Sequence, residues 1–293
     1  MTTMTALAPF TISSALEWAI AHLMAVTDVV ELEAEILLAH VLRASRTHLH
    51  AWPDRLLSES EQTHYSQFVK RRLEGEPIAY VTGKREFWSL ELTVTPDTLI
   101  PRPETEILVE LALSKLNDDE IKTIADLGTG SGAIALALAS ERPGWVVHAT
   151  DRVAATLQVA KANAVRLDLA HVKFHEGSWC EALPKLSFDA IISNPPYIAE
   201  GDPQLNQQVL LTEPRAALLS GEDGLLDIRR IIQEARSYLK SGGYLLLEHG
   251  ARQAEAVKSL MQQAGYVQIE SYQDLAGLDR ATIGQFQSVT IAS

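Results

Sequence analysis

The sequence predicts an α/β protein with a doubly wound, mostly parallel sheet of seven strands, preceded by a small all-helical domain and a β-hairpin linker. Three observations predict this fold. Apolar residues recur at helical spacing through residues 12–74, short β-type runs follow over 79–100, and strand-like and helix-like segments alternate from residue 121 onward. The alternation favours parallel strands with helices on both faces. We therefore expect a helical domain at 1–78, a hairpin linker at 79–100 and a larger domain at 101–293.

The N-terminal segment carries the signals of helix ends as well as apolar stripes. Residues 58–61 read Ser-Glu-Ser-Glu, which is a capping-box pattern, and Gly75 with Pro77 ends the helix that follows. Apolar stripes of this kind are typical of a small helical bundle. The segment contains no residues that suggest catalytic chemistry, so the function open to it is recognition of a partner.

The larger domain is predicted to alternate strands and helices. The expected strands lie near 122–127, 146–151, 172–176, 188–193, 243–249, 267–272 and 281–291. The expected helices lie near 131–141, 153–168, 224–239 and 251–264. Ligands of such sheets bind beyond the carboxyl ends of the strands, near the point where the strand order reverses. We expect the functional site at that edge.

Composition and charge exclude several classes of protein. One cysteine, Cys180, cannot form an internal disulfide and fits a reducing compartment. There is no uninterrupted apolar run of about 18 residues, so no membrane span is expected. Residues 1–10 carry no positive charge before their weak apolar stretch, which argues against a secretory signal. We expect a soluble cytoplasmic protein.

The net charge of −13 argues mildly against nucleic acid as the main partner, because duplexes are bound mainly by neutralising phosphates.

A glycine-rich turn follows the first strand of the larger domain. Residues 125–132 read Ala-Asp-Leu-Gly-Thr-Gly-Ser-Gly, and the next residues open a helix. Such a turn suits a dinucleotide, a nucleotide or S-adenosylmethionine, but the spacing is GxGxG and no Lys-Ser/Thr pair follows, which excludes a P-loop. A carboxylate before the glycines would repel a pyrophosphate and attract an ammonium or sulfonium group, which favours S-adenosylmethionine. The candidate cofactor residues here are Asp126, Gly128, Thr129, Gly130, Ser131 and Gly132.

The next two strands end in further candidates for the cofactor site. Asp151, about twenty residues beyond the glycines, is placed to accept hydrogen bonds from ribose hydroxyls; the alternative is a cap for the next helix. Ser178 and Trp179 follow the third strand, where the adenine ring is expected. Trp179 can pack on that ring and Ser178 can hydrogen-bond it, although an aromatic residue there is as often plain core.

The fourth strand runs into Asn194, Pro195, Pro196 and Tyr197, which we interpret as the catalytic and substrate-binding turn. The prolines end the strand in a rigid conformation. Nitrogens conjugated to a carbonyl group or a ring are poor nucleophiles, because their lone pair is delocalised. The Asn194 side-chain oxygen and the Pro195 carbonyl oxygen can accept both N–H hydrogens of such a nitrogen and turn its lone pair toward a methyl group. Tyr197 can stack on the planar group, and no strong base is needed.

Other candidate sites are weaker. His171 and His175 are four residues apart on an expected strand with no third ligand in view, and His48 and His50 are isolated, so no metal is expected. The sequence also has no nucleophile elbow and no Cys-x-x-Cys pair. Residues 99–106, Leu-Ile-Pro-Arg-Pro-Glu-Thr-Glu, form a stiff turn that can be read as a simple helix start.

Taken together, these stretches resemble the peptide chain release factor N5-glutamine methyltransferases, within the class I S-adenosylmethionine-dependent methyltransferases with a Rossmann-like sheet. The resemblance covers nearly the whole chain. The Asn-Pro-Pro-Tyr turn alone is shared with adenine methyltransferases, and its combination with residues 99–106 is far more specific. The stretches that carry the resemblance are 75–80, 85–88, 99–106, 126–132, 194–197 and 245–250.

The resemblance implies methylation of the glutamine in the Gly-Gly-Gln loop of class I release factors, with a helical domain that helps to grip the release factor. It implies that the glycine turn, Asp151, Trp179 and Asn194 bind the cofactor, that residues 194–197 bind the glutamine, and that Arg102 and Glu104 shape the substrate entrance. Ser178 departs from the family, which often has an acidic residue there. We expect the protein itself to act as a monomer, without direct contact with nucleic acid or membrane.

Three alternatives stay open from the residues alone. An adenine-N6 methyltransferase of DNA or RNA would have the same Asn-Pro-Pro-Tyr turn, but would also need a basic groove and a target-recognition region, which we do not find in the sequence. A glutamine methyltransferase of a ribosomal protein is a closer alternative, and the Arg-Pro-Glu stretch at 102–104 argues against it. The third is a non-catalytic binding module, against which an intact Asn194 and glycine turn argue.

Overall fold

The computed structural model describes residues 10–116, 120–202 and 207–288, although the side chains of 207 and 208 are outside this description. The chain divides into two compact units, Met1–Gly83 and Lys84–Ser293. The strand expected at 281–291 ends at Phe286, and its last residues from 289 lie outside the described part. Within the described residues, no helix combines the length and apolarity needed to cross a bilayer.

The first unit is a helical bundle, as the apolar periodicity predicts. Its helices are α1 (Ile12–Leu23), α2 (Val30–Leu42), α3 (Arg46–Ala51), α4 (Glu59–Leu73) and α5 (Ile78–Thr82). The capping box at the start of α4 is confirmed: the Ser58 hydroxyl accepts a hydrogen bond from the Glu61 backbone N–H, and the Glu61 side chain accepts one from the Ser58 backbone N–H. Side chains such as Leu37, Leu38 and Tyr65 fill the core between α1, α2 and α4.

The short helix α5 corrects one prediction. Tyr80 and Val81 have β-type side chains and were expected in a strand, but they lie in α5. Pro77 precedes this helix with φ already fixed, and Gly83 ends it in the left-handed region, so the two helix-end signals outweigh the propensity of two residues. The hairpin itself is β1 (Lys84–Phe87) paired antiparallel with β2 (Leu90–Thr93), and it belongs to the second unit.

The second unit contains the predicted seven-stranded sheet, in the order β5-β4-β3-β6-β7-β9-β8. All strands run parallel except β9, which is antiparallel to both its neighbours. The strands are β3 (Thr123–Leu127), β4 (Val146–Asp151), β5 (Lys173–Glu176), β6 (Phe188–Ser193), β7 (Leu239–Glu248), β8 (Tyr266–Gln273) and β9 (Asp279–Phe286). In this order β6, the fourth predicted strand, lies beside β3, the first.

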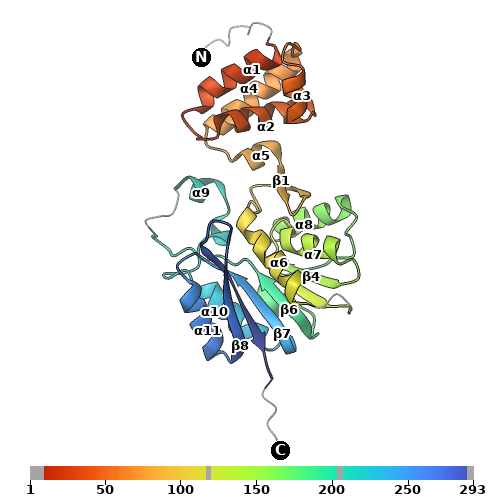
Figure 1. The fold of residues 1–293 in the computed structure, drawn as a ribbon, viewed down its shortest axis with the longest axis vertical. Coiled ribbons are helices and arrows are strands. Elements are labelled where there is room, and N and C mark those ends of the chain that lie inside the picture. Colours follow the sequence, from red (N-terminus) through yellow and green to blue (C-terminus); the bar gives the residue numbers. More distant parts are fainter. Residues whose placement is uncertain (1–9, 117–119, 203–206, 289–293) are drawn as a thin grey trace, which may run out of the picture. The chain divides into compact units, whose positions relative to one another are not determined.

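Helices cover both faces of the sheet (Figure 1). On one face lie α6 (Glu106–Lys115), α7 (Ala133–Glu141) and α8 (Ala154–Arg166), and on the other lie α10 (Leu226–Ala235) and α11 (Ala254–Gln263). Side chains alternate along the strands between two cores, because successive residues of a strand point to opposite faces. Ile124, Ile192 and Leu246 belong to the core with α6 and α7, whereas Ala125, Ile191 and Leu245 belong to the core with α10 and α11.

Four short helical segments near the carboxyl edge were not expected from the sequence. They are η1 (Pro103–Thr105), η2 (Trp179–Ala182), α9 (Gln207–Thr212) and η3 (Arg215–Ala217). Two of them, η1 and η2, start within stretches that the sequence singled out for their chemistry. Their brevity explains the omission, since three to six residues carry too little periodicity to reveal a helix.

Candidate active site

The glycine-rich turn joins β3 to α7 at the point where the strand order reverses. Gly128 has φ +70°, and a Cβ atom there would lie 3.0 Å from the indole ring of Trp179. Glycine is therefore needed both for the left-handed backbone and for the close approach of the indole. Trp179 itself has φ +45° at the start of η2. The turn and the tryptophan thus form two walls of one site, as their positions in the sequence suggested.

Asp126 holds the turn against the first residues of α7. Its Oδ2 accepts hydrogen bonds from the Thr129 hydroxyl (2.6 Å) and the Ala135 backbone N–H (3.1 Å). Its Oδ1 is buried and has no hydrogen-bond partner among the described residues. Burial raises the pKa of this carboxyl group to about 7, against the opposing effect of the two hydrogen bonds. These two bonds give Asp126 a part in shaping the turn, whereas its attraction for the cofactor stays a prediction.

Asp151 links the glycine turn to the start of α8. One carboxylate oxygen accepts a hydrogen bond from the Gly130 backbone N–H (3.1 Å), and the other accepts one from the Val153 backbone N–H (3.0 Å). Val153 is the N-cap residue of α8 and makes no side-chain cap, so Asp151 supports the helix start without being its cap residue. Burial raises the pKa of Asp151. Each oxygen keeps a lone pair for a ligand hydroxyl.

A pocket of about 690 Å³ opens in front of these residues. Seven predicted cofactor or substrate residues line it: Gly128, Gly130, Asp151, Ser178, Trp179, Asn194 and Pro196. In the described part of the chain, Asp126, Thr129, Ser131 and Gly132 are not among its lining residues and belong to the turn behind it. Sequence reasoning missed the other residues that line the pocket, which are Asp97, Leu99, Arg152, Val153, Thr156, Gly177, Pro214, Ala216 and Ala217.

Asn194 lies at the meeting point of this pocket and a second one. The second pocket, of about 800 Å³, is lined by Leu99, Arg102, Asn194, Pro195, Tyr197, Ile198, Asp202, Val209, Ala217 and Leu218. Leu99, Asn194 and Ala217 line both pockets. The adjacency follows from the sheet: Ser193 pairs with Leu127 and donates its hydroxyl hydrogen to the Leu127 carbonyl, so residues 194 and 128 emerge side by side.

The side chain of Asn194 is oriented by Thr105. Its Nδ2 donates a hydrogen bond to the Thr105 hydroxyl oxygen at 3.0 Å. An amide has one donor end and one acceptor end, so this bond leaves Oδ1 as the acceptor available to a ligand. Thr105 was not among the predicted site residues, although it stands within the stretch 99–106 that the sequence singled out.

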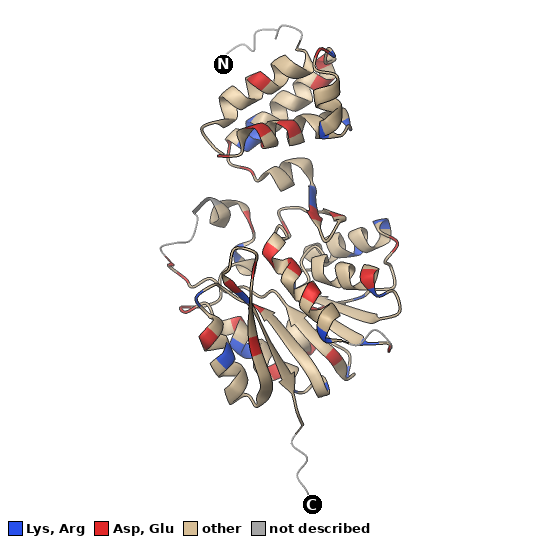
Figure 2. Cartoon of the chain, viewed as in Figure 1, with Lys and Arg blue, Asp and Glu red and all other residues tan. Residues whose placement is uncertain are grey.

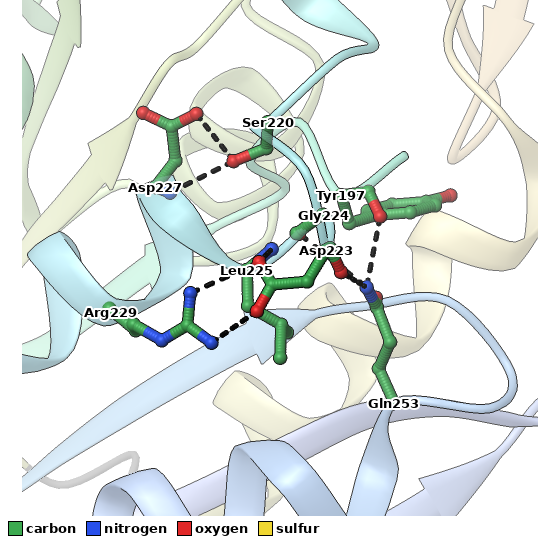
Figure 3. Close-up of polar contacts among 8 residues, drawn as sticks. All are labelled: Tyr197, Ser220, Asp223, Gly224, Leu225, Asp227, Arg229 and Gln253. Carbon is green, nitrogen blue, oxygen red and sulfur yellow. Dashed lines mark hydrogen bonds and ion pairs between the residues drawn. The ribbon is translucent and has the colours of Figure 1, made fainter. Parts of the chain in front are cut away.

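Tyr197 is held at both its ring and its backbone. Its hydroxyl group donates a hydrogen bond to Glu248 Oε1 (3.2 Å). Its carbonyl oxygen accepts one from Gln253 Nε2 (3.0 Å), as Figure 3 shows. The Gly250 backbone N–H in turn donates to Gln253 Oε1 at 2.8 Å, which fixes the orientation of the Gln253 amide. Neither Glu248 nor Gln253 was among the predicted site residues.

Arg102 lines the second pocket, and its charge is paired. Its Nη2 lies 2.5 Å from Oε1 of Glu213, whose side chain is only 3% exposed. Glu213 Oε2 also accepts a hydrogen bond from the Ile100 backbone N–H (3.1 Å). This pairing ties the stretch that contains Arg102 to the segment after α9. Glu104 is exposed, and among the described residues it is not part of either pocket wall.

The histidines form no metal site among the described residues, where no group of three or more potential ligands was found. One detail of the sequence reasoning was wrong: β5 begins at Lys173, so His171 precedes the strand that contains His175. His175 instead stacks on His148 of β4, with Nε2 of one ring 2.9 Å from Nδ1 of the other. Burial lowers the pKa of His148 to about 4, so this histidine is neutral at physiological pH.

Comparison with known proteins agrees with this arrangement. The model of the PrmC N-terminal domain matches residues 14–83, and that of the methyltransferase small domain matches residues 104–271. A release factor glutamine methyltransferase from Coxiella burnetii is 53% identical over 264 residues, covering 90% of this chain and 95% of that protein. The one from Escherichia coli K12 is 46% identical over 254 residues, covering 87% and 91%.

A solved methyltransferase from Pyrococcus furiosus shares the fold, with a TM-score of 0.53 at 18% identity, over 76% of this chain and 100% of that one. The two sequence relatives carry the family assignment, because both exceed 45% identity over most of each chain. The chain therefore belongs to the release factor glutamine methyltransferases, a family of S-adenosylmethionine-dependent enzymes.

Proposed function

We propose that this protein transfers the methyl group of S-adenosylmethionine to the side-chain amide nitrogen of the glutamine in the Gly-Gly-Gln loop of class I release factors. The position of Asn194 carries the proposal, because this residue lines both pockets and its bond to Thr105 leaves the amide oxygen as the acceptor for a ligand. The names of the relatives point to the same class of substrate.

The residues of the first pocket fit S-adenosylmethionine. Its lining combines apolar side chains with a few polar groups, as small-molecule sites do. Asp151 offers two acceptor oxygens for ribose hydroxyls, and Trp179 offers an apolar surface for a planar ring. When bound, S-adenosylmethionine supplies an electrophilic methyl group on a positively charged sulfur.

The turn at 194–197 orients the substrate amide nitrogen, which is a poor nucleophile. Asn194 Oδ1 and the Pro195 carbonyl oxygen accept the two N–H hydrogens of the substrate amide, which fixes the nitrogen and directs its lone pair toward the first pocket. Proximity and orientation of this kind supply effective concentrations of about 10⁵–10⁸ M. Tyr197 covers the planar amide from the second pocket. As the new C–N bond forms, the C–S bond breaks, and the methylated nitrogen then loses its acidic proton to water.

We assign the helical domain, 1–78, to recognition of the release factor and the methyltransferase domain, 101–293, to catalysis. The segment between them, 79–100, contains the hairpin β1–β2 and serves as the linker. Met24, Trp52 and Leu56 of the helical unit are exposed apolar side chains suited to a protein partner. We place the reaction in the cytoplasm, carried out by a monomer without nucleic acid or membrane. Lys and Arg are scattered among acidic residues in both units (Figure 2), which favours a protein over a nucleic-acid substrate.

A methylation assay tests the proposal. The purified protein is incubated with labelled S-adenosylmethionine and a class I release factor, and the modified residue is mapped by mass spectrometry. We expect one methyl group on the glutamine of the Gly-Gly-Gln loop and no incorporation when that glutamine is replaced by alanine. Label in nucleic acid would favour an adenine-N6 methyltransferase. Label in a ribosomal protein would favour a ribosomal-protein glutamine methyltransferase, and the absence of any label would favour a non-catalytic binding module.

Replacing Asp151 by asparagine is expected to weaken cofactor binding about 10- to 100-fold. The variant keeps the side-chain shape but loses the charge and one acceptor oxygen, and hydrogen bonds to charged groups contribute about 1.5–3 kcal/mol. Titration calorimetry with S-adenosylmethionine measures the effect. The control is Glu176→Gln at the exposed end of the neighbouring strand β5, which should bind the cofactor as the parent does. Equal affinity of D151N and the parent would contradict a role in binding the ribose.

A further inference from the structure

A buried carboxylate holds the guanidinium group of Arg102 at the wall of the second pocket. The Glu213 side chain is 3% exposed, and each of its oxygens accepts one hydrogen bond, Oε1 from Arg102 Nη2 and Oε2 from the Ile100 backbone N–H (3.1 Å). A carboxylate is costly to bury unless it is paired and hydrogen-bonded, and Glu213 is both. The pair therefore fixes a cationic side chain beside the pocket.

The backbone around Arg102 is also restrained. Arg102 stands between Pro101 and Pro103, and a residue that precedes proline is confined to extended conformations. Its φ of −95° and ψ of 143° lie in that region. The Pro101 carbonyl oxygen accepts a hydrogen bond from Arg85 Nε (3.2 Å). Because little conformational freedom is left to lose, a ligand binds this guanidinium group at a low cost in entropy.

Most of the hydrogen-bond donors of Arg102 remain available. A guanidinium group has five N–H hydrogens in one plane and no acceptor. Among the described residues, its side-chain hydrogen bonding is confined to Nη2 and Glu213. The Arg102 side chain is 34% exposed and lines the second pocket together with Asn194 and Pro195. The remaining N–H groups can therefore donate to a ligand that enters this pocket.

The charges around the second pocket favour a neutral ligand. Among the described residues that line it, Arg102 and Asp202 are the charged ones. Each is paired with an opposite charge: Arg102 with Glu213, and Asp202 with Arg252, whose Nη2 lies 3.9 Å from Asp202 Oδ2. These pairs leave no net positive charge to attract an anion such as phosphate. A neutral acceptor, such as a peptide carbonyl group, fits this wall better.

The substrate of the proposed function offers such acceptors. Glycine has no side chain, so a Gly-Gly-Gln loop can be recognised beyond its glutamine only through main-chain N–H and C=O groups. The glutamine amide is assigned to Asn194 and Pro195, which line the same pocket as Arg102. The loop carbonyl groups closest to that glutamine are therefore the acceptors closest to the guanidinium group.

We propose that Arg102 is a substrate-binding residue, which donates hydrogen bonds to main-chain carbonyl oxygens of the Gly-Gly-Gln loop, and that Glu213 is the positioning residue that holds its guanidinium group in place. The proposal rests on the proposed function and adds recognition of the loop backbone to recognition of the glutamine amide. Because it assigns binding and not the chemical step to Arg102, removal of this residue raises KM and leaves kcat unchanged.

Replacing both members of the pair tests the proposal without leaving a buried charge unpaired. In the double variant Arg102→Met/Glu213→Gln, glutamine keeps an acceptor for the Ile100 N–H. We expect KM for the release factor to rise about 10- to 100-fold, with kcat and the Kd for S-adenosylmethionine within about threefold of the parent values. A loosened pocket wall would weaken cofactor binding as well, because Leu99, next to Ile100, lines both pockets.

The double variant Asp189→Asn/Lys240→Met is the matched control. Asp189 Oδ2 likewise accepts one hydrogen bond from a backbone N–H, that of Thr123 (2.8 Å), and one from a cation, Lys240 Nζ (2.8 Å). Asp189 and Lys240 lie at the amino ends of β6 and β7, whereas the pockets lie at the carboxyl edge of the sheet. The control should keep the KM of the parent. Thermal melts establish that both double variants are folded.

Three outcomes would overturn the assignment of Arg102. A KM of R102M/E213Q within about threefold of the parent would show that the guanidinium donors are not needed. An equal rise of KM in D189N/K240M would assign the effect to lost stability, and an equal loss of cofactor affinity in R102M/E213Q would assign it to the pocket wall. All are measured against a parent that methylates the release factor. An inactive parent instead contradicts the proposed function, so the two failures are distinguishable.

Two further measurements test the positioning role and the class of ligand. Glu213→Gln alone keeps the Arg102 donors but weakens their anchor, so we expect KM to rise about 3- to 10-fold at unchanged kcat. A KM equal to that of the parent would remove Glu213 from the proposal. Inorganic phosphate should not compete with the release factor in the parent. Competition that disappears in R102M/E213Q would assign the guanidinium group to an anionic ligand and contradict the proposal.

Discussion

Replacing Asn194 by alanine is expected to lower kcat for release factor methylation about 10²–10³-fold, which is the loss typical of removing one preorganised hydrogen-bonding group from an active site. The substitution leaves the Pro195 carbonyl as the sole acceptor for the substrate amide, so the nitrogen rotates and its lone pair is no longer held toward the methyl group. Single-turnover methylation under saturating cofactor measures this step directly.

The same variant separates catalysis from cofactor binding. Asn194 is one of many residues that line the first pocket, so the Kd for S-adenosylmethionine should change by less than about tenfold, an effect within that of one hydrogen bond. The control is Gln262→Ala, which removes an exposed amide side chain on α11. Full activity of N194A would remove Asn194 from the mechanism. A loss of cofactor affinity equal to the loss of activity would reduce its role to cofactor binding.

The strands, the glycine turn and the Asn-Pro-Pro-Tyr turn were predictable because each is written in consecutive residues. Alternating buried runs marked β3 and β6, and the parallel register of these strands brought Gly128 beside Asn194. Where two local signals competed, the prediction failed. Tyr80 and Val81 favour a strand by propensity, but Pro77 and Gly83 enclose them in the helix α5.

The groups that orient the turn could not be predicted, because they reach it from distant parts of the chain. Thr105 lies 89 residues from Asn194, and Gln253 lies 56 residues from Tyr197. Glu213 lies 111 residues from Arg102. The sequence contains only a weak signal of such pairs: polar residues that follow or end apolar strands, as Glu248 does in Leu245–Glu248. Deciding which partner each of them binds requires the folded sheet.

Replacing Gly224 by alanine is expected to disturb the catalytic turn. Gly224 has φ +74°, and a Cβ atom there would lie 2.3 Å from the Tyr197 carbonyl oxygen and 2.9 Å from Gln253 Nε2. The left-handed backbone costs alanine about 1–2 kcal/mol, and overpacking adds about 1–3 kcal/mol. We expect a loss of about 2–5 kcal/mol in the free energy of unfolding and a fall in kcat of about 10²-fold.

Bonds on both sides of Gly224 oppose a movement of its segment that would relieve the clash (Figure 3). The Ser220 hydroxyl accepts a hydrogen bond from the Asp227 backbone N–H (2.9 Å), and Asp223 pairs with Arg229. The displacement therefore falls on the Tyr197 carbonyl and its bond to Gln253, which shifts the turn that holds the substrate.

Gly277→Ala is the matched control for this experiment. Gly277 has φ +75°, nearly that of Gly224, but no atom lies within 4 Å of the Cβ position. G277A should therefore lose only the backbone contribution of about 1–2 kcal/mol and keep the kcat of the parent. Urea denaturation measures the free energy of unfolding of both variants, and the methylation assay measures their kcat. The comparison separates the cost of the left-handed backbone from the steric clash of the new Cβ atom with Tyr197 and Gln253. Equal effects of G224A and G277A on kcat would mean that catalysis tolerates displacement of the Tyr197 backbone. The hydrogen bond from Gln253 to the Tyr197 carbonyl oxygen would then contribute nothing to catalysis.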